Sequence, residues 1–302
     1  MMEFTKSSEE ERDARVKNLI IKDNFSEINN PGDRIVITGK GGTGKTTITA
    51  TMSRLLMQQR HVLAVDADPQ MNLPYAMGIP RDTVRKIVPL NMQADYIEEK
   101  TGARPGSGWG EFLSLNPDVS DVVDRFGIKV DDRMSILVMG TLHKSGIGCL
   151  CPENDLLDAV VRHVSLRDNE TILMDTEAGV EHFGRAIAKG FGHAIVVSDV
   201  SFNSVQVASS AMKLAWDLGI KGIHLVFNRV EEDASAIGTL VREIDADFPY
   251  TIDIIPYDRS VKTVDPSVQH LVEGNNEFLP AVKKLLGRIY PEVTGEIFDS
   301  TR

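Results

Sequence analysis

The chain has 302 residues and a mass of 33.3 kDa, and its 42% hydrophobic and 25% charged residues are the balance of a globular protein with a sizeable core. No apolar run approaches the ~18 residues that span a bilayer, and the charged start of the chain is unlike a secretory signal, so we expect neither membrane spanning nor export. The formal net charge of −11 disfavours nucleic acid and anionic membrane surfaces as partners. With only 2 cysteines the chain cannot build a disulfide framework, and a cytoplasmic protein is expected.

In chain order, residues 1–32 are charged and polar, and we expect them to form an N-terminal arm. Residues 33–302 then read as one domain in which apolar runs alternate with helical patterns. The expected strands are 35–38, 62–65, 136–139, 171–174, 194–198, 224–227 and 252–255, and the expected helices are 46–58, 156–164, 183–189, 204–218, 236–244 and 277–289. This alternation predicts an α/β fold whose mostly parallel sheet carries helices on both faces. Residues 80–133, which are interrupted by glycine and proline, are interpreted as an insertion with long loops and little regular structure.

The strongest motif lies between the first expected strand and the first expected helix. The run GKGGTGKTT at positions 39–47 fits the pattern GxxxxGK[ST] of a phosphate-binding loop. Glycines let successive backbone N–H groups converge on phosphate oxygens, the following helix presents its positive end, and lysine adds a cation. We therefore expect a nucleotide to bind through Gly41, Gly42, Thr43, Gly44, Lys45, Thr46 and Thr47, with the Thr46 hydroxyl on Mg²⁺.

A second lysine, Lys40, lies near the start of this loop, where an ordinary phosphate loop does not need one. With it, the run resembles the deviant Walker A sequence of the ATPase group that contains the nitrogenase iron protein, MinD and ParA. The resemblance implies a P-loop NTPase fold, hydrolysis of ATP to ADP and phosphate, and nucleotide-dependent homodimers. It also implies that Lys40 reaches the ATP phosphates of the other subunit, where it would act as an arginine finger does.

Carboxylates follow two of the expected strands, at the edge where a parallel sheet binds its ligand. They are Asp66 and Asp68 after the second strand and Asp175 after the strand at 171–174. The resemblance implies that Asp68 positions the attacking water, that Asp66 belongs to the outer shell of Mg²⁺, and that Asp175 holds Mg²⁺ as the Walker B aspartate. For Asp66 and Asp68 the simpler alternative is a cap on the next helix.

Two later strand ends resemble the parts of these ATPases that contact the base. Asn228, followed by Arg229, resembles the asparagine that reads adenine, and an amide can both donate to and accept from the edge of the base. Pro256 lies in a stretch that resembles the loop lining the base. Asparagine and proline at strand ends are also common turn residues, which is the alternative explanation for both.

The two cysteines, Cys149 and Cys151, form a Cys-x-Cys pair that offers two soft ligands. A symmetric dimer could bring two such pairs together into a tetrahedral Cys₄ site for Ni²⁺ or Zn²⁺, and a [4Fe–4S] cluster is a further candidate. The spacing fits two ordinary thiols or a redox pair about as well. His143 could join such a shell, although an exposed loop histidine is the simpler interpretation.

Together with the segments at 139–140, 149–154 and 178–182, the cysteine pair resembles the carbon monoxide dehydrogenase maturation ATPases of the CooC type. That resemblance implies an ATP-dependent accessory protein that helps to insert nickel into the nickel–iron–sulfur cluster of CO dehydrogenase, or of an acetyl-CoA synthase partner. The client would be the apo-enzyme, with no role for nucleic acid or membrane. Two alternatives come from the wider group: a positioning ATPase of the MinD and ParA type, and a reductase like the nitrogenase iron protein.

Overall fold

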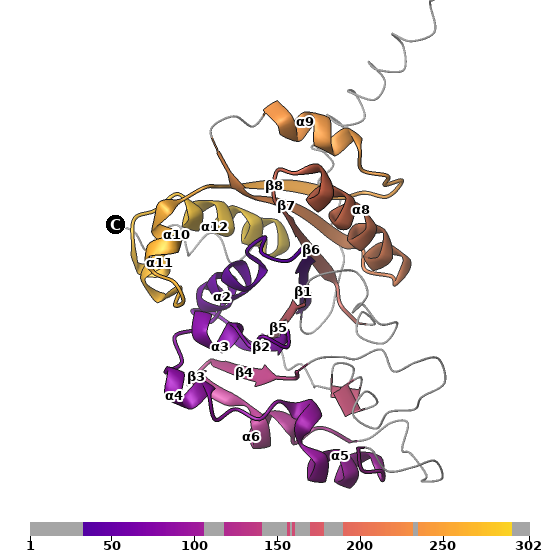
Figure 1. Cartoon of the computed structure of the whole chain (residues 1–302), viewed down its shortest axis with the longest axis vertical. Helices are drawn as coiled ribbons and strands as arrows, with labels where there is room; N and C mark the ends of the chain where they lie inside the picture. The colour runs from indigo at the N-terminus through magenta and orange to yellow at the C-terminus, as the bar shows by residue number, and fades with distance from the viewer. Residues whose placement is uncertain are drawn as a thin grey trace, which may run out of the picture.

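The structure, a computed structural model, describes residues 33–105, 118–140, 156–157, 159–160, 170–177, 190–231 and 235–291. A central eight-stranded sheet has the order β3-β4-β2-β5-β1-β6-β7-β8 (Figure 1). The strands are β1 (Asp33–Gly39), β2 (His61–Ala67), β3 (Ile128–Asp131), β4 (Met134–Val138), β5 (Glu170–Thr176), β6 (His193–Ser198), β7 (Gly222–Val230) and β8 (Thr251–Pro256). All neighbouring strands pair in parallel except β3, which runs antiparallel to β4.

Helices pack on both faces of this sheet, because successive residues of each buried strand point to opposite sides. In β1, Val36 joins one hydrophobic cluster and its neighbours Ile35 and Ile37 join the other. The helices are α2 (Lys45–Leu56), α3 (Leu73–Ala76), α4 (Arg81–Val84), α5 (Ala94–Thr101), α6 (Val122–Phe126), α8 (Phe202–Asp217), α9 (Ser235–Arg242), α10 (Arg259–Thr263), α11 (Gln269–Glu273) and α12 (Phe278–Ile289), with a 3-10 turn η1 (Leu90–Met92). Helices α2, α11 and α12 supply the cluster around Ile35, whereas α8 and α9 supply the cluster around Val36. The expected α/β fold is confirmed.

Helix α8 illustrates how the sequence sets an element. It begins after Ser201, whose Oγ accepts a hydrogen bond of 3.3 Å from the Ser204 N–H, an N-cap that satisfies one of the free donors of the first turn. Its buried face includes Val205, Ala208 and Met212, spaced by one helical turn. The helix ends before Gly219, whose φ of 96° is a left-handed conformation that suits glycine.

The expected strands outside residues 80–133, and the helices expected at 46–58, 204–218, 236–244 and 277–289, coincide with observed elements to within a few residues at each end. Of the helix expected at 156–164, the structure describes only residues 156–157 and 159–160, which are helical. The helix expected at 183–189 lies outside the described residues, as does the N-terminal arm. The expectation of little regular structure at 80–133 is wrong. That stretch holds α4, η1, α5, α6 and β3.

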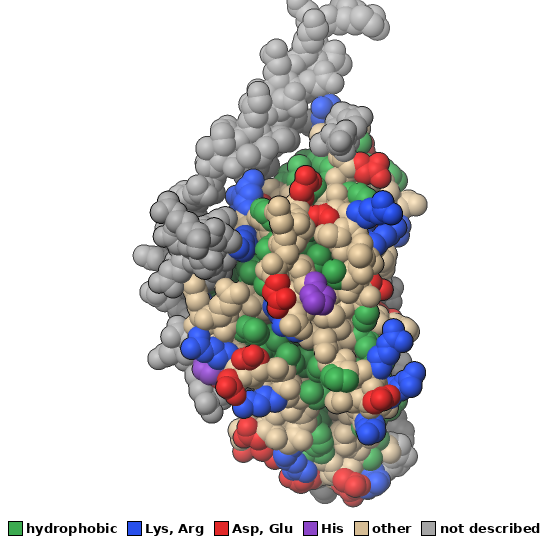
Figure 2. All heavy atoms as spheres, turned by 90° about the vertical axis from the view of Figure 1, so that its left-hand side faces the viewer, with side chains coloured by type: hydrophobic (Ala, Val, Ile, Leu, Met, Phe, Trp, Pro, Cys, Tyr) green, Lys and Arg blue, Asp and Glu red, His purple; other side chains and the backbone are tan. Residues whose placement is uncertain are grey.

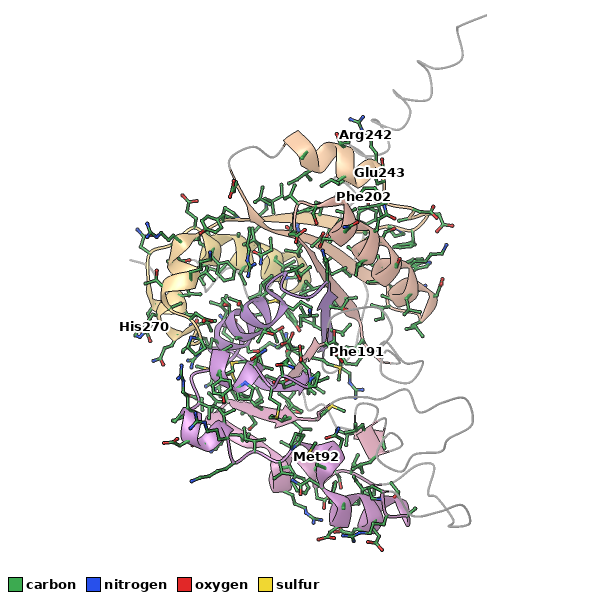
Figure 3. All side chains as sticks on the ribbon, viewed as in Figure 1. Met92, Phe191, Phe202, Arg242, Glu243 and His270 are labelled. Atoms are coloured by element: carbon green, nitrogen blue, oxygen red, sulfur yellow. The ribbon has the colours of Figure 1, made fainter. Side chains whose placement is uncertain are left out.

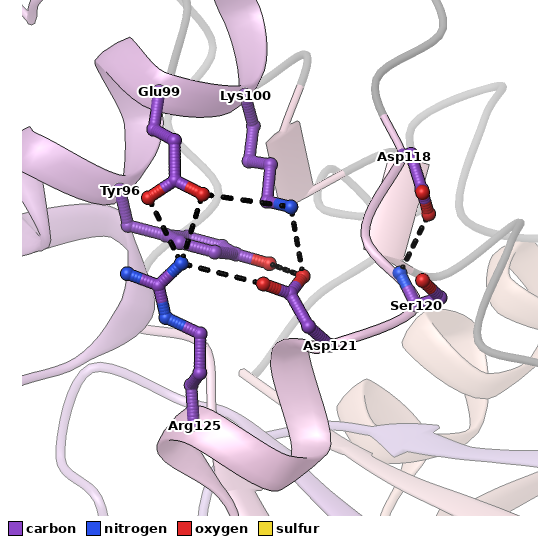
Figure 4. A network of polar contacts seen from close by, with 7 residues as sticks. All are labelled: Tyr96, Glu99, Lys100, Asp118, Ser120, Asp121 and Arg125. Atoms are coloured by element: carbon purple, nitrogen blue, oxygen red, sulfur yellow. Dashed lines mark hydrogen bonds and ion pairs between the residues drawn. The ribbon is translucent and has the colours of Figure 1, made fainter.

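A network of polar contacts explains why part of this stretch is ordered (Figure 4). The Tyr96 hydroxyl donates a hydrogen bond of 2.9 Å to Asp121, and the Lys100 ammonium lies 2.9 Å from the same carboxylate. Arg125 forms an ion pair of 2.9 Å with Glu99 and packs its guanidinium 4.5 Å from the centre of the Tyr96 ring. These contacts join α5 to α6, although the bonded residues Tyr96 and Asp121 are 25 positions apart in the sequence.

The surface of the described residues carries both signs of charge. On the face shown in Figure 2, acidic and basic side chains are interspersed, and no large area of one sign covers it. The negative net charge of the chain is therefore not gathered on that face. Within the described residues, no helix is long and apolar enough to cross a membrane.

Candidate functional site

The phosphate loop occupies residues 40–44, between the end of β1 and the start of α2. Gly39 has a φ of 136°, and a Cβ at this position would collide with the carbonyl oxygen of Val197 in β6. Only glycine therefore lets β1 turn into the loop so close to its neighbouring strand. Lys45 is 6% exposed, and its ammonium donates hydrogen bonds of 3.3 Å to the carbonyl oxygens of Gly39 and Lys40. The lysine side chain thus folds back over the loop that its own helix follows.

Burial lowers the pKa of Lys45, and the carboxylates of Asp175, Asp68 and Glu177 act in the opposite direction. These negative charges at the ends of β2 and β5 favour the charged ammonium. The structure thus brings the predicted phosphate-binding lysine and the predicted aspartates into one electrostatic environment.

Asp175, at the end of β5, and Thr46, in the first turn of α2, contact each other at the carboxyl edge of the sheet. The Thr46 hydroxyl donates a hydrogen bond of 2.6 Å to Asp175 Oδ2, and the aspartate is 1% exposed. Its other oxygen, Oδ1, is buried and has no hydrogen-bond partner among the described residues. Burial raises the pKa of Asp175 to about 7, although the Thr46 hydroxyl and the Lys45 charge lower it. An unpaired buried carboxylate oxygen beside a hydroxyl is an arrangement of hard oxygen donors that fits Mg²⁺.

Asp66 lies beside Asp175, since the two residues are register partners of β2 and β5. It is fully buried, and its two oxygens accept hydrogen bonds from the backbone N–H groups of Asp68 (3.0 Å) and Leu73 (3.1 Å). Burial and the neighbouring Asp175 raise its pKa well above the usual range. Asp66 therefore holds the loop between β2 and α3 through backbone hydrogen bonds, as the capping alternative predicts. It also lies next to Asp175, the candidate Mg²⁺ ligand.

Asp68 follows on this loop and is only partly buried. Its Oδ1 accepts a hydrogen bond of 2.8 Å from the Gln70 N–H, so the carboxylate is held by a local turn. Lys40, at the other end of the site, is also partly buried, and its carbonyl accepts a hydrogen bond of 2.8 Å from the Thr43 hydroxyl. The roles expected of both side chains, positioning water and reaching a second subunit, remain predictions.

A hollow of about 280 Å³ lies next to the loop, and the residues expected to contact the base line it. They are Asn228, Arg229 and Pro256, which the structure brings together with Gly44 and Thr47. Tyr257, which ends the stretch that resembles the base-lining loop, also lines the hollow. The sequence pattern did not single out the residues that complete the wall, which are Asp258, Val261, Lys262, Asp265 and Phe278. They come from α10, the chain on either side of it and α12, and no motif marks them.

A second cleft of about 510 Å³ continues along the first turn of α2, past Thr46 and Thr47. Asn72 and Tyr75 line it from the start of α3, and Arg81 and Arg85 line it from α4. A third hollow, of about 250 Å³, lies at the amino ends of β2, β4 and β5 and shares no residue with the phosphate loop. The first two cavities together give the carboxyl edge of the sheet room for a nucleotide and its surroundings.

The expected thiolate site cannot be compared with the structure, because Cys149, Cys151 and His143 lie outside the described residues. Within the described residues, no group of three or more histidine, cysteine or acidic side chains is arranged to hold a metal ion.

Comparison with known proteins agrees with this geometry. Residues 35–267 match the family model described as the CobQ/CobB/MinD/ParA nucleotide binding domain. An uncharacterised ATP-binding protein of Methanocaldococcus jannaschii, MJ0823, is 38% identical over 76% of this chain and 86% of its own length. The carbon monoxide dehydrogenase accessory protein CooC of Rhodospirillum rubrum is 35% identical over 77% of this chain and 86% of its own length.

Solved structures support the fold. MinD of Pyrococcus horikoshii, in complex with Mg-ADP, superposes with a TM-score of 0.58 at 19% identity and covers 88% of this chain. The MinC:MinD complex of Aquifex aeolicus gives 0.57 at 20% identity over 84% of this chain. The expectations of a P-loop fold and of the ATPase class are confirmed at the level of the family. The chain belongs to the CobQ/CobB/MinD/ParA family of nucleotide-binding proteins, together with CooC.

Proposed function

We propose that this protein is an ATP-hydrolysing accessory protein that helps to insert nickel into the nickel–iron–sulfur cluster of CO dehydrogenase or a related acetyl-CoA synthase. The observation that carries the proposal is the 35% identity to CooC over 86% of that protein's length. The phosphate loop and the three aspartates supply the ATPase machinery that such a role requires. We also propose that the protein works in the cytoplasm, where its two thiols would stay reduced.

In this proposal each residue of the site has one task. Backbone N–H groups of the loop and the Lys45 ammonium bind the ATP phosphates, while Thr46 and Asp175 hold Mg²⁺, with Asp66 behind them. Asp68 orients the attacking water. Lys40 crosses to the ATP of a second subunit and neutralises the charge that develops on the transferred phosphoryl group. Mg²⁺, when bound, would neutralise negative charge on the phosphate oxygens.

Lys40 makes ATP part of the dimer interface, so nucleotide binding would bring two subunits together. We propose that Cys149 and Cys151 of both subunits then bind one Ni²⁺ or Zn²⁺ between them as a Cys₄ site. Hydrolysis separates the subunits and weakens this shared site, which provides a means of releasing nickel to the apo-enzyme. The output of the ATPase would thus be a change of assembly.

The test is the mass of the anaerobically purified protein in solution, with and without ATP–Mg²⁺ and one equivalent of nickel or zinc. The variants are Cys149→Ser with Cys151→Ser, which removes the proposed thiolates, and Lys40→Ala, which removes the proposed contact between subunits. We expect the wild type to form dimers that hold about one metal ion per two chains, as a shared Cys₄ site requires. The serine variant should bind no metal but keep its nucleotide response, and Lys40→Ala should still bind ATP but no longer dimerise with it.

Equal metal binding by the wild type and the serine variant would remove the cysteines from the function and leave a nucleotide-switched ATPase. A visible absorption band together with iron and acid-labile sulfide in the purified wild type would indicate an iron–sulfur cluster and favour the reductase alternative, since a zinc or nickel site contains neither iron nor sulfide.

A further inference from the structure

The end of β7 contacts the phosphate loop directly through two neighbouring side chains. Asn228 is 4% exposed, and its Nδ2 donates a hydrogen bond of 2.7 Å to the carbonyl oxygen of Thr43. Its Oδ1 accepts a hydrogen bond of 2.9 Å from the Arg229 N–H. The Arg229 guanidinium in turn donates a hydrogen bond of 2.9 Å, from Nη1, to the carbonyl oxygen of Gly42. Two consecutive carbonyls of the loop are therefore held from outside the loop.

The backbone of this strand end is shaped for these contacts. Arg229 has a φ of 60°, a left-handed conformation that costs free energy in a residue with a side chain. The pairing of β7 with β8 shifts register at the same place, between Phe227 and Val230. On the loop side, Gly44 makes room, because a Cβ there would collide with Nδ2 of Asn228. The strained backbone of Arg229 and the absence of a side chain at Gly44 therefore both allow the strand end to contact the phosphate loop.

Holding a carbonyl also orients an N–H group. In a trans peptide the carbonyl of one residue and the N–H of the next point in opposite directions. Fixing the carbonyl oxygens of Gly42 and Thr43 toward β7 therefore points the N–H groups of Thr43 and Gly44 away from β7. Those N–H groups are among the donors that a phosphate loop offers to its ligand. The strand end thus sets the direction of the groups that bind phosphate.

We propose that Arg229, together with Asn228, is a positioning residue that holds the phosphate loop in its phosphate-binding conformation. This gives the pair a task that the sequence did not predict, since reading the adenine edge was expected there. Both residues also line the 280 Å³ hollow beside the loop, so a base in that hollow contacts the groups that orient the loop. The proposal rests on nucleotide binding by this family and is independent of the metal and client roles proposed above.

The experiment compares two ligands, Mg–ATP and Mg–tripolyphosphate, by calorimetric titration of the full chain. Tripolyphosphate has the phosphates but no base, so it separates loop positioning from base contact. The variants Arg229→Gly and Arg229→Asn remove the guanidinium but place residues that accept a left-handed backbone. We expect both to weaken the binding of ATP and of tripolyphosphate by a similar factor, about tenfold, because one charge-assisted hydrogen bond to the loop is lost.

Arg229→Lys is the conservative rescue, since lysine can restore a single donor to the Gly42 carbonyl, and it should recover part of both affinities. Lys262→Asn is the matched control. It removes a cation from the wall of the same hollow. Unlike Arg229, Lys262 is not assigned a contact with a carbonyl of the phosphate loop in this proposal. We therefore expect tripolyphosphate binding to weaken by less than about threefold, through the loss of a screened charge alone.

Thermal unfolding of the ligand-free variants separates positioning from general stability. The unfolding midpoints of Arg229→Gly and Arg229→Asn should lie within about 3 °C of the wild type, since relief of backbone strain offsets the lost hydrogen bond. Unchanged tripolyphosphate affinity in both variants, with weaker ATP binding, would overturn the proposal and return Arg229 to base contact. A fall in both affinities that accompanies a large drop in midpoint, without rescue by lysine, would also overturn it.

Discussion

Buried polar groups at the two edges of the same sheet are arranged for opposite purposes. At the carboxyl edge, Asp175 is buried with one oxygen unpaired among the described residues, and its burial raises its pKa to about 7. At the amino edge, His193 Nδ1 and His224 Nε2 lie 3.1 Å apart, and His224 Nδ1 lies 2.8 Å from the Thr251 hydroxyl. Here each ring has a hydrogen-bond partner, and burial lowers the pKa values of His193 and His224 to about 4 and about 3.

The comparison between Asp175 and the histidine pair shows which buried groups lower the stability of the ligand-free protein. A buried carboxylate with one unpaired oxygen destabilises the ligand-free protein, and a bound cation removes the penalty. The two imidazoles are instead held by each other and by the Thr251 hydroxyl, which stabilises the fold without a ligand. Asp253 lies between these extremes. It is buried like Asp175, but Arg288 supplies a permanent cation 2.9 Å from its Oδ1.

The largest expected effect comes from Asp175→Asn. Asparagine keeps an acceptor for the Thr46 hydroxyl but removes the negative charge, so Mg²⁺ would be held weakly and steady-state ATPase activity should fall by about 100-fold or more. Because a buried charge is removed, the free energy of unfolding of the ligand-free protein at pH 7 should be unchanged or higher. Denaturant unfolding measures the second quantity, and activity within tenfold of wild type would contradict the assigned role.

The same substitution inside β8, Asp253→Asn, should give the reverse result. It leaves the Arg288 guanidinium without its buried partner, and we expect a loss of roughly 1–3 kcal/mol in the free energy of unfolding. ATPase activity per folded molecule should stay near wild type, since Asp253 lines neither the base hollow nor the cleft along α2. If Asp253→Asn instead reduced activity without changing stability, the contrast between Asp175 and a buried aspartate paired with an arginine would not hold.

The parts of the molecule that could be predicted from sequence depend on short-range patterns. The phosphate loop lies within nine consecutive positions, and the buried strands are runs of apolar residues, so both were predictable. Strand β3 escaped prediction because it is four residues long and pairs with β4 through an irregular register. Helices α5 and α6 are short and depend on contacts between distant residues, such as Tyr96 with Asp121.

The site divides in the same way. Lys45 and Thr46 begin α2 within a recognisable motif, and the aspartates lie at strand ends. The contact of Arg229 with the Gly42 carbonyl, in contrast, joins residues 187 positions apart. No local pattern specifies the left-handed backbone that aims the arginine at the loop. Sequence patterns therefore single out candidate ligand-binding groups more readily than the groups that hold them in place.

The histidine pair predicts an acid-sensitive amino edge. In the unfolded chain both histidines titrate near their usual pKa of about 6.5, whereas the folded values are about 4 for His193 and about 3 for His224. As pH falls below about 6.5, the unfolded state takes up protons first, so stability is lost progressively until the folded values are reached. The slope should approach about 1.4 kcal/mol per pH unit for each histidine. Denaturant unfolding at pH 7, 6 and 5 measures it.

The control for this slope is the exposed histidine on α11, His270, which lies at the outer edge of the molecule in Figure 3. His270→Gln should leave the dependence of stability on pH unchanged. His224→Gln should lower stability at pH 7, because a buried bonded ring is replaced, but should flatten the slope below pH 6.5. Equal slopes in the wild type and His224→Gln would assign the acid sensitivity to other groups.

The smallest effect tests whether ordinary stabilising contacts also operate at the carboxyl edge. Ser201 caps α8 there by accepting the Ser204 N–H, and its hydroxyl also donates to Asp199. Ser201→Ala should cost about 1 kcal/mol of unfolding free energy, the usual value of an N-cap. Ser210→Ala, on the exposed side of the same helix, should change stability by less than about 0.5 kcal/mol. Nucleotide affinity should be the same in both variants. If Ser201→Ala also weakened ATP binding, the cap of α8 would be part of the ligand site. The carboxyl edge would then not separate into groups that bind the ligand and groups that only stabilise the fold.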